Sequence, residues 1–539
     1  MRMLRLALLT AVATGLLAVP ALAADPTYVD EVIKVPSKYG RVWAEVHRPE
    51  GMGKVPIILT YSPYNTINEN GGNIADDSVA ATFGPKGYAR VVADVIGTRN
   101  STGCWDYGGA KEQQSGVDLV NALAAQPWSN GKVAMMGTSY DGTTANMVAA
   151  RGKDVPGLAA IVPIAAINHW YGYAYQDGVR YFGNSKKPSD EGIDTPLGFD
   201  FGLARTPPTK PDQDSVIDLP TGRYNPCDSV QHTQYGYDTT PDYDRFWLDR
   251  DYIKDAAKVR VPVLQVHGWQ DYNVKQSEGL DMWLAEKNAP FKILYMWQAS
   301  HAEPSSKDYM DLLAAFFDRT LKGIKNGVEN QPRVHTFGRT GTTTDAQPTL
   351  APSWPLPGTK KLNLELGRTA DGGVLAAQAG GDPATYTDTG TGSEERAFQE
   401  GVDAEDGWLY YATAPLAAPM HLAGSAILDL ELSDSADHGQ LSPTLVDVAP
   451  DGSAVPIARG HLNLQYRDGL ASAVPNPVDT PFRARVRLAP QDQTIPAGHR
   501  LGIIVESSNV IWAIADQPTG YDMTVHHGTS KLVLPVVGG

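Results

Sequence analysis

The sequence predicts a protein of the α/β class, in which a doubly wound parallel sheet carries an inserted cap and is followed by an all-β domain. Three observations support this prediction. Buried apolar runs alternate with helical segments over the first part of the chain. Residues 168–255 interrupt that alternation with many Tyr, Asp, Pro and Gly residues. After residue 340, short alternating runs separated by Gly and Pro dominate, which is typical of antiparallel sandwiches.

The first sheet is predicted from its apolar runs. Residues 42–48 alternate apolar and polar side chains, as a half-buried strand does. Buried parallel strands are expected at 55–60, 89–95, 133–136, 158–163, 261–266 and 291–296. Helices are expected to end within 80–87 and to span 112–125, 279–286 and 309–321. The order of these elements indicates a doubly wound sheet.

The later part of the chain is predicted to be a separate β domain. Its strands are expected at 362–366, 426–432, 483–488, 501–505 and 531–535. The Gly-, Ala- and Thr-rich stretch 367–392 is expected to be a long exposed connection. We therefore expect a catalytic domain at 24–167 and 256–340, a cap at 168–255 and an all-β domain at 341–539.

The N-terminus has the pattern of a secretory signal peptide. Arg2 and Arg5 supply positive charge, residues 6–19 form an apolar run, and 21–23 (Ala-Leu-Ala) form a cleavage site. A membrane anchor is disfavoured because the run is short and ends at that cleavage site. We expect residues 1–23 to be removed and the mature protein to be secreted.

Composition limits the partners. The chain has 539 residues, which favours two or three domains. Without the two signal arginines, Lys and Arg fall from 45 to 43 against 61 acids, and the formal charge changes from −16 to −18. So acidic a surface argues against nucleic acid and anionic membranes as partners. Cys104 and Cys227 are an even pair in a chain expected to be exported, which favours a disulfide, although two separate thiols are the alternative.

Ser139 is the candidate nucleophile. The stretch 131–142 (GKVAMMGTSYDG) reads as a buried strand, a sharp turn and the start of a helix. A serine on such a turn projects from the carboxyl edge of a sheet, and the backbone N–H of Tyr140 would face a developing oxyanion. Asp141 stands where the second Gly of the usual G-x-S-x-G pattern would be. An ordinary Gly-rich turn is the alternative, so the assignment depends on an acid and a histidine downstream.

Asp271 and His301 are these downstream partners. Asp271 follows the strand at 261–266, and His301 follows the next strand, at 291–296. The order Ser, Asp, His is that of α/β-hydrolases, in which the imidazole takes the serine proton and the carboxylate orients the imidazole. His267 competes with His301, but we interpret it as a structural histidine. Tyr64, after the strand at 55–60, is the candidate second oxyanion donor, with core packing as the alternative.

No cofactor is expected from the sequence. The histidine pair 526–527 and the remaining histidines show no metal-ligand spacing with Cys or acidic residues. A serine mechanism needs no metal, because imidazole can activate a hydroxyl near neutral pH.

Several motifs of the chain are similar to those of one family. They are GTRNSTG (97–103), VAMMGTSY (133–140), INHWY (167–171), FWLDRDY (246–252), HGWQDYNV (267–274) and AGHR (497–500). In this combination the chain resembles the Xaa-Pro dipeptidyl-peptidases of the S15 serine peptidase family, with the related cocaine esterases and α-amino acid ester hydrolases. The motifs span nearly all of the predicted mature chain.

The resemblance implies an α/β-hydrolase with a helical cap and a C-terminal jelly roll. It implies the triad Ser139, Asp271 and His301, and an oxyanion hole made by Tyr64 and the N–H of Tyr140. It also places Trp170 and Tyr173 where the peptidases have aromatics lining the proline pocket, since such rings suit an apolar imino acid. Asp177 is a candidate partner for the α-amino group of the substrate, and a solvated loop acid is the alternative.

The chain also departs from the resemblance. The lactic-acid-bacterial peptidases are longer, are cytoplasmic and carry an N-terminal helical domain that this chain lacks. The ester hydrolases have extra acids near the site, whereas Tyr272, Asn273 and Val274 follow Asp271 here. We therefore expect a secreted exopeptidase acting on peptides with proline at the second position, of unknown oligomeric state. The alternatives are a secreted esterase or acylase, and a non-catalytic protein whose β domain grips a polymer.

Overall fold

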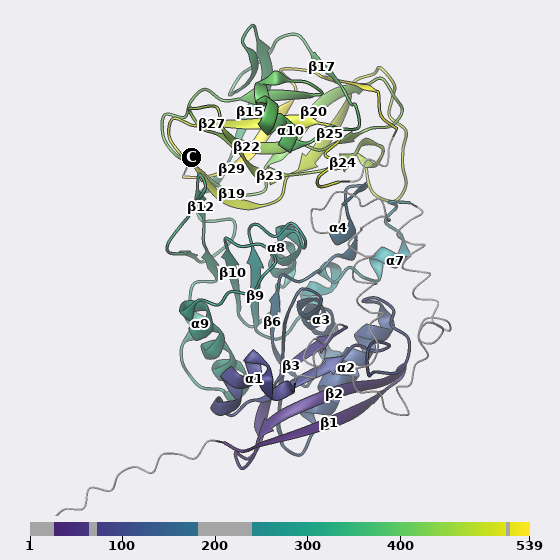
Figure 1. Ribbon diagram of the computed structural model, residues 1–539, viewed down its shortest axis with the longest axis vertical. Coiled ribbons are helices and arrows are strands. Elements are labelled where there is room, and N and C mark those ends of the chain that lie inside the picture. The colour runs from purple at the N-terminus through teal and green to yellow at the C-terminus, as the bar shows by residue number, and fades with distance from the viewer. Residues whose placement is uncertain (1–25, 64–72, 182–239, 514–517, 539) are drawn as a thin grey trace, which may run out of the picture.

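Figure 1 shows the computed structural model of the protein, which has a lower α/β lobe and an upper β-rich lobe. The structure describes residues 26–63, 73–181, 240–513 and 518–538. Among the described residues, ten strands form the sheet of the lower lobe, in the order β1-β2-β4-β3-β5-β6-β9-β10-β11-β14. Their bounds are β1 Tyr28–Ser37, β2 Gly40–Pro49, β3 Val55–Ser62, β4 Ala89–Asp94, β5 Ser129–Thr138, β6 Leu158–Ile164, β9 Val263–Gly268, β10 Lys292–Trp297, β11 Val334–Thr336 and β14 Thr349–Ala351.

The strands from β4 to β11 pair in parallel, whereas β1, β2 and β14 add antiparallel edges. The central strands are apolar and buried on both faces because helices cover each side. The helices are α1 Ser78–Phe83, α2 Ala110–Ala124, α3 Tyr140–Ala149, α8 Gln276–Ala285 and α9 Lys307–Phe317. One core packs α2 and α3 on the sheet, and another packs α1 and α9 on it. This doubly wound arrangement confirms the predicted class of fold.

The described part of the predicted cap is short. It contains α4 (Trp170–Ala174), a hairpin of β7 (Tyr175–Gln176) and β8 (Val179–Arg180), and α7 (Arg245–Leu248). These segments lie between the two lobes in Figure 1. Most of the region for which a cap was predicted lies outside the described residues.

The upper lobe is β-rich, as the sequence predicts, and its sheet is curled (Figure 1). Among the described residues, fifteen strands belong to this sheet. They are β12 Arg339–Thr340, β13 Thr343–Thr344, β15 Thr359–Thr369, β16 Gly372–Ala376, β17 Ala384–Thr387, β18 Trp408–Ala412, β19 Met420–Gly424, β20 Ile427–Asp434, β22 Thr444–Val448, β23 Ala454–Arg459, β25 Phe482–Arg487, β26 Gln491–Ile495, β27 Arg500–Glu506, β28 Asp522–Val525 and β29 Lys531–Val537. The lobe also contains the pair β21 (Gln440–Leu441) and β24 (Leu462–Asn463) and the helix α10 (Glu394–Glu400).

The stretch 367–392 is not the long exposed connection expected from its composition. It contains the end of β15 and all of β16 and β17; β16 pairs with β15 and β18, and β17 pairs with β28. Some of its glycines lie where neighbouring backbone approaches closely. At Gly373, for example, a Cβ would lie 2.0 Å from the carbonyl oxygen of Tyr410.

The two lobes interlock where one passes into the other. β12 and β13 already belong to the upper sheet, whereas the later strand β14 returns to pair with β11 of the lower sheet. Trp354 then packs its ring 5.2 Å from that of Trp269, in a buried cluster that also includes Ala423 of β19. Within the described residues, no helix is long and apolar enough to cross a membrane.

Candidate active site

Ser139 occupies the turn between β5 and α3. Its backbone is in a left-handed region that is strained for a residue with a side chain, with φ 65° and ψ −128°. The turn is tight because glycines flank it. A Cβ on Gly137 would lie 2.4 Å from that of Asp141, and one on Gly142 would lie 2.7 Å from the carbonyl oxygen of Gly137. The glycine that the tight turn requires after the serine is therefore Gly142, and this explains why Asp141 is tolerated.

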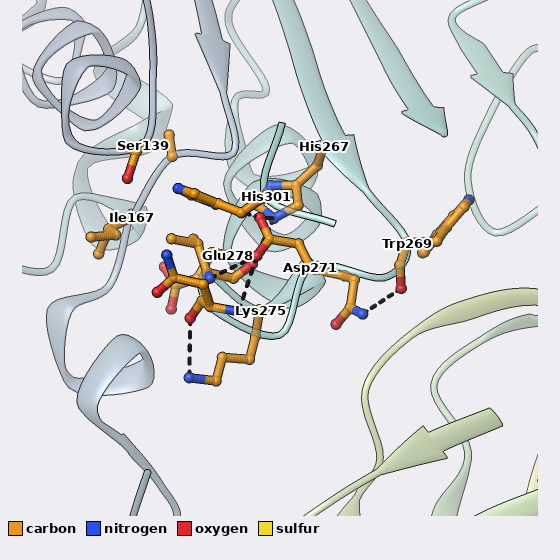
Figure 2. A network of polar contacts seen from close by, with 12 residues as sticks. Ser139, Ile167, His267, Trp269, Asp271, Lys275, Glu278 and His301 are labelled. Carbon is orange, nitrogen blue, oxygen red and sulfur yellow. Dashed lines mark hydrogen bonds and ion pairs between the residues drawn. The ribbon is translucent and has the colours of Figure 1, made fainter. Parts of the chain in front are cut away.

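The acid and the histidine meet at the same edge of the sheet. Asp271 follows β9, and His301 follows the neighbouring parallel strand β10. The Nδ1 of His301 lies 2.8 Å from an Oδ of Asp271. In Figure 2 the ring of His301 lies between Asp271 and the turn that carries Ser139. Among the described residues, the Nε2 of His301 has no hydrogen-bond partner, so this nitrogen can take a proton from a neighbouring hydroxyl.

Asp271 is held as a carboxylate by its surroundings. Its burial opposes ionisation, but hydrogen bonds from His267 and His301 outweigh burial and lower the pKa of Asp271 to about 2. Its other oxygen accepts the N–H groups of Asn273 and Val274, at 3.1 and 2.9 Å. The group is therefore charged at any pH near neutrality and is oriented by its own loop.

His267 contacts the loop that carries Asp271. The side chain is fully buried, and its Nε2 lies 2.8 Å from the carbonyl oxygen of Val274 and 3.5 Å from Asp271. The shorter contact with the carboxylate belongs to His301. This geometry agrees with the interpretation of His267 as a structural histidine.

Tyr140 begins α3 directly after the serine, so its N–H belongs to the first turn of that helix. Its hydroxyl donates a hydrogen bond of 2.8 Å to Glu112. The same carboxylate also accepts hydrogen bonds from the indole of Trp105 and from the N–H of Gly108. Burial, together with the nearby Asp106, raises the pKa of Glu112 to about 8. The sequence did not single out Glu112, which reads as an ordinary acid of an amphipathic helix. The other predicted oxyanion donor, Tyr64, lies outside the described residues.

Two of the three predicted substrate-binding residues lie close to this site. The ring of Trp170 is 5.2 Å from that of Tyr140 and 5.9 Å from that of Tyr173. The hydroxyl of Tyr173 donates a hydrogen bond of 3.3 Å to the side chain of Asn273, which lies two residues after Asp271. Trp170 is fully buried, and its indole donates to the hydroxyl of Tyr252.

Asp177 lies elsewhere, in a cavity of ≈ 190 Å³ between the lobes. Lys275, Glu278 and Arg487 also line this cavity, and burial raises the pKa of Asp177. Neither Trp170 nor Tyr173 lines it. The structure therefore does not place Asp177 together with the two aromatic residues.

Lys275 and Glu278 are buried ionisable residues that the sequence pattern does not reveal. The ammonium of Lys275 donates to the carbonyl oxygens of Tyr173 and Asn273, and burial lowers its pKa to about 7. Glu278 accepts the N–H groups of Asn168 and His169, and burial raises its pKa to about 8. Figure 2 shows both residues on the segment after Asp271. Nothing in their spacing marks them as buried, because burial depends on α4 packing over them.

Across the described residues, no group of three or more His, Cys, Asp or Glu side chains could hold a metal ion. Cys104 is among the described residues, but Cys227 lies outside them.

The doubly wound sheet, the strained serine turn and the Asp–His pair at its carboxyl edge define an α/β-hydrolase. The model of the X-Pro dipeptidyl-peptidase (S15) family matches residues 40–303, and that of the C-terminal non-catalytic domain of X-Pro dipeptidyl-peptidases matches 326–531. The chain belongs to the S15 family of serine hydrolases.

Relatives named for more than one activity are similar to this chain. A protein of Streptomyces avermitilis named "Putative Xaa-Pro dipeptidyl-peptidase" is 28% identical, over 93% of this chain and 81% of its own. The Xaa-Pro dipeptidyl-peptidase of Lacticaseibacillus casei is 24% identical, over 94% and 69%. The cocaine esterase of a Rhodococcus strain is 25% identical, over 88% and 90%.

Solved structures support the fold along most of the chain. A CocE/NonD family hydrolase from Staphylococcus aureus aligns with a TM-score of 0.74 at 18% identity, covering 94% of this chain and 93% of that one. An α-amino acid ester hydrolase aligns with a TM-score of 0.72 at 19% identity, covering 98% and 100%. At such identities the likeness shows the fold and not the substrate.

Proposed function

We propose that this protein is a serine exopeptidase that releases Xaa-Pro dipeptides from peptide N-termini through an acyl-enzyme. The observation that carries the proposal is the 2.8 Å contact between Asp271 and His301 beside the turn of Ser139, in a chain of the S15 family. In the proposed mechanism Ser139 is the nucleophile, His301 the base and then the acid, and Asp271 the orienting carboxylate.

The proposed reaction has two halves. His301 takes the Ser139 proton at Nε2 as Oγ attacks the carbonyl carbon of the proline, and the tetrahedral oxyanion accepts the N–H of Tyr140. His301 then gives that proton to the leaving amine as the C–N bond breaks, which leaves an acyl-enzyme. A water molecule, deprotonated by His301, attacks this ester, and His301 returns the proton to the Oγ of Ser139 as the C–O bond breaks and the dipeptide leaves. Tyr64 is proposed as the second oxyanion donor.

Substrate selection is proposed to involve Trp170 and Tyr173. Both lie against groups of the site, namely the Tyr140 ring and Asn273. Flat rings suit proline, which is apolar and has no N–H once acylated. Asp177 remains a proposed partner for the α-amino group. If it has this role, Asp177→Asn should raise KM for free-amino substrates and leave N-acetylated ones unchanged.

A second candidate is an esterase or acylase with the same triad, because one relative is named cocaine esterase and one fold neighbour α-amino acid ester hydrolase. A panel of Gly-Pro- and Ala-Pro-p-nitroanilides, their N-acetylated forms and p-nitrophenyl esters separates the two. The peptidase proposal expects turnover of the free-amino anilides. Turnover of esters alone would favour the second candidate.

Ser139→Ala is the control for both candidates. It should lower kcat by about 10⁴-fold or more, since a triad acts as a unit. An unchanged rate would refute Ser139 as the nucleophile.

We also propose that the protein is exported and that Cys104 pairs with Cys227. The N-terminal pattern of charge, apolar run and small residues supports export. Mass spectrometry of the protein from a culture supernatant should find Ala24 as the first residue. Thiol labelling of the denatured, unreduced protein should find no free cysteine, and two labelled cysteines would refute the pairing.

A further inference from the structure

We infer that the β-rich lobe is a working part of the hydrolytic site, because two of its segments hold the loop that carries Asp271. We call residues 268–274 the acid loop. The matched family model describes the C-terminal domain as non-catalytic, whereas here its side chains anchor the acid loop on both sides of the carboxylate. The inference rests on the proposed triad, in which a displaced Asp271 would lose its hold on His301.

The first anchor lies on Tyr272, directly after Asp271. The guanidinium carbon of Arg459, at the end of β23, is 4.6 Å from the centroid of the Tyr272 ring. The same guanidinium is 4.4 Å from the ring of Trp512, and the two rings are 4.9 Å apart. A cation in contact with two neighbouring aromatic rings is stabilised when it is shielded from water.

Arg459 is itself rigidly held. The side chain is buried and makes a bidentate ion pair with Glu394 at the start of α10. Glu394 also accepts from the indole of Trp512, at 3.1 Å, and from the hydroxyl of Thr444, at 3.2 Å. The anchor is therefore a pre-assembled unit of the β-rich lobe and not a flexible surface contact.

The second anchor lies on Trp269, two residues before Asp271. The amide of Gln491, in β26, donates 3.1 Å to the carbonyl oxygen of Trp269. The next residue, Asp492, accepts from Thr336, whose hydroxyl in turn accepts from the indole of Trp269. Both Trp269 and Gln491 are buried, so these bonds are shielded from competition by water.

The first anchor is also connected to the segment before His301. The hydroxyl of Tyr272 donates 3.1 Å to Gln270, whose backbone N–H donates 2.9 Å to the carbonyl oxygen of Ala299. The side-chain amide of Gln270 donates to Gln298. The acid loop and the segment before His301 thus form one connected unit. A shift of about 1 Å in such a unit is enough to lower a catalytic rate by up to a hundredfold.

The test removes the first anchor without leaving a buried charge unpaired. We combine Arg459→Met with Glu394→Gln and, separately, make Tyr272→Leu. The readout is the rate at which a fluorophosphonate labels Ser139, measured from pH ~5 to ~9, because this rate needs the triad but not a particular acyl group. We expect each change to slow labelling by about tenfold. We also expect a shift in the midpoint of the acidic limb of the curve of labelling rate against pH, since a displaced carboxylate no longer stabilises the protonated imidazole.

A variant that carries Arg459→Met, Glu394→Gln and Tyr272→Leu together should slow labelling by less than the product of the separate effects, because Arg459 acts through Tyr272. Arg483→Met with Asp429→Asn removes a more exposed ion pair of the same lobe; it is the control and should label at the rate of the unaltered enzyme. If the Arg459 variant does not fold, Tyr272→Leu and Gln491→Leu carry the test.

Folded variants that label within twofold of the unaltered enzyme, with an unmoved midpoint, would overturn the inference. Labelling of the unaltered enzyme without cleavage of Xaa-Pro anilides would instead overturn only the proposed substrate. No labelling at all would overturn the triad on which both proposals rest.

Discussion

At the scale of single residues, the site depends on buried charges whose protonation is set by their neighbours. Asp271 stays charged because two histidines donate to it. Glu112 is the opposite case, since one of its oxygens accepts three hydrogen bonds and the other has no partner among the described residues. A proton on that second oxygen would cost no hydrogen bond, which fits the raised pKa of Glu112.

Glu112→Gln should therefore stabilise the protein at neutral and higher pH. Because the folded-state pKa of Glu112 is raised to about 8 from 4.5, the unfolded chain loses this proton first as the pH rises. Stability should fall by up to about 1.4 kcal/mol per pH unit between these two values, and no further above pH 8. The Glu112→Gln variant should not show this fall in stability, because the Gln side chain does not ionise.

Urea unfolding of both proteins at pH ~5 to ~9 measures the difference. If the difference in unfolding free energy between the two proteins does not increase with pH, the prediction is wrong. Activity measured on the same samples shows whether the Tyr140 backbone still serves the site when Gln accepts the tyrosine hydroxyl.

At the scale of elements, the turn between β5 and α3 works only if strand and helix meet closely. A Cβ on Gly142 would meet backbone on all sides, at 2.7 Å from Gly137 and 2.9 Å from both the nitrogen and the oxygen of Ile164. Backbone atoms of central strands cannot move aside as a flexible side chain can. The same crowding holds Ser139 in its strained conformation.

Gly142→Ala should therefore lower the free energy of unfolding by about 1–3 kcal/mol and reduce kcat by displacing Ser139. Denaturant unfolding and steady-state kinetics measure the two effects. Gly380→Ala is the matched control, because no atom lies within 4 Å of its Cβ position. Equal behaviour of the two variants would show that the turn is less tightly packed than described.

At the scale of the whole molecule, the two lobes are joined by apolar packing more than by surface charge. Trp354 is buried against Trp269. The ion pair between Arg487 and Asp281 also joins the lobes, at 2.8 and 3.0 Å, but its side chains are 48% and 31% exposed. Water and salt screen such a pair, so its contribution is small.

Trp354→Ala should thus cost about 3–5 kcal/mol of unfolding free energy, and Arg487→Ala less than about 1 kcal/mol. Chemical denaturation of the two variants in one buffer makes the comparison direct. A larger loss for Arg487→Ala than for Trp354→Ala would reverse our view of how the lobes are joined.

The fold class, the order of Ser139, Asp271 and His301, and their placement after strands could all be predicted from the amino-acid sequence. These features are local, because a parallel strand reads as an apolar run and its end fixes which residue reaches the sheet edge. The sequence was misleading at 367–392, where the glycine content indicates a loop although the stretch forms paired strands and Gly373 lies close against Tyr410 of β18.

The distant residues that surround the proposed triad could not be predicted in this way, because they are brought together by packing of the folded chain. Glu112, Lys275, Arg459 and Trp512 carry no local signal, since an acid or a cation has the same pattern on a surface as in a core. Glu112, Lys275 and Arg459 are buried by helices and a second lobe that pack over them from elsewhere in the chain, and the same packing brings Trp512 against Arg459. The chemistry of the proposed nucleophile could be predicted from the sequence, whereas the support around its acid depends on contacts between segments far apart in sequence.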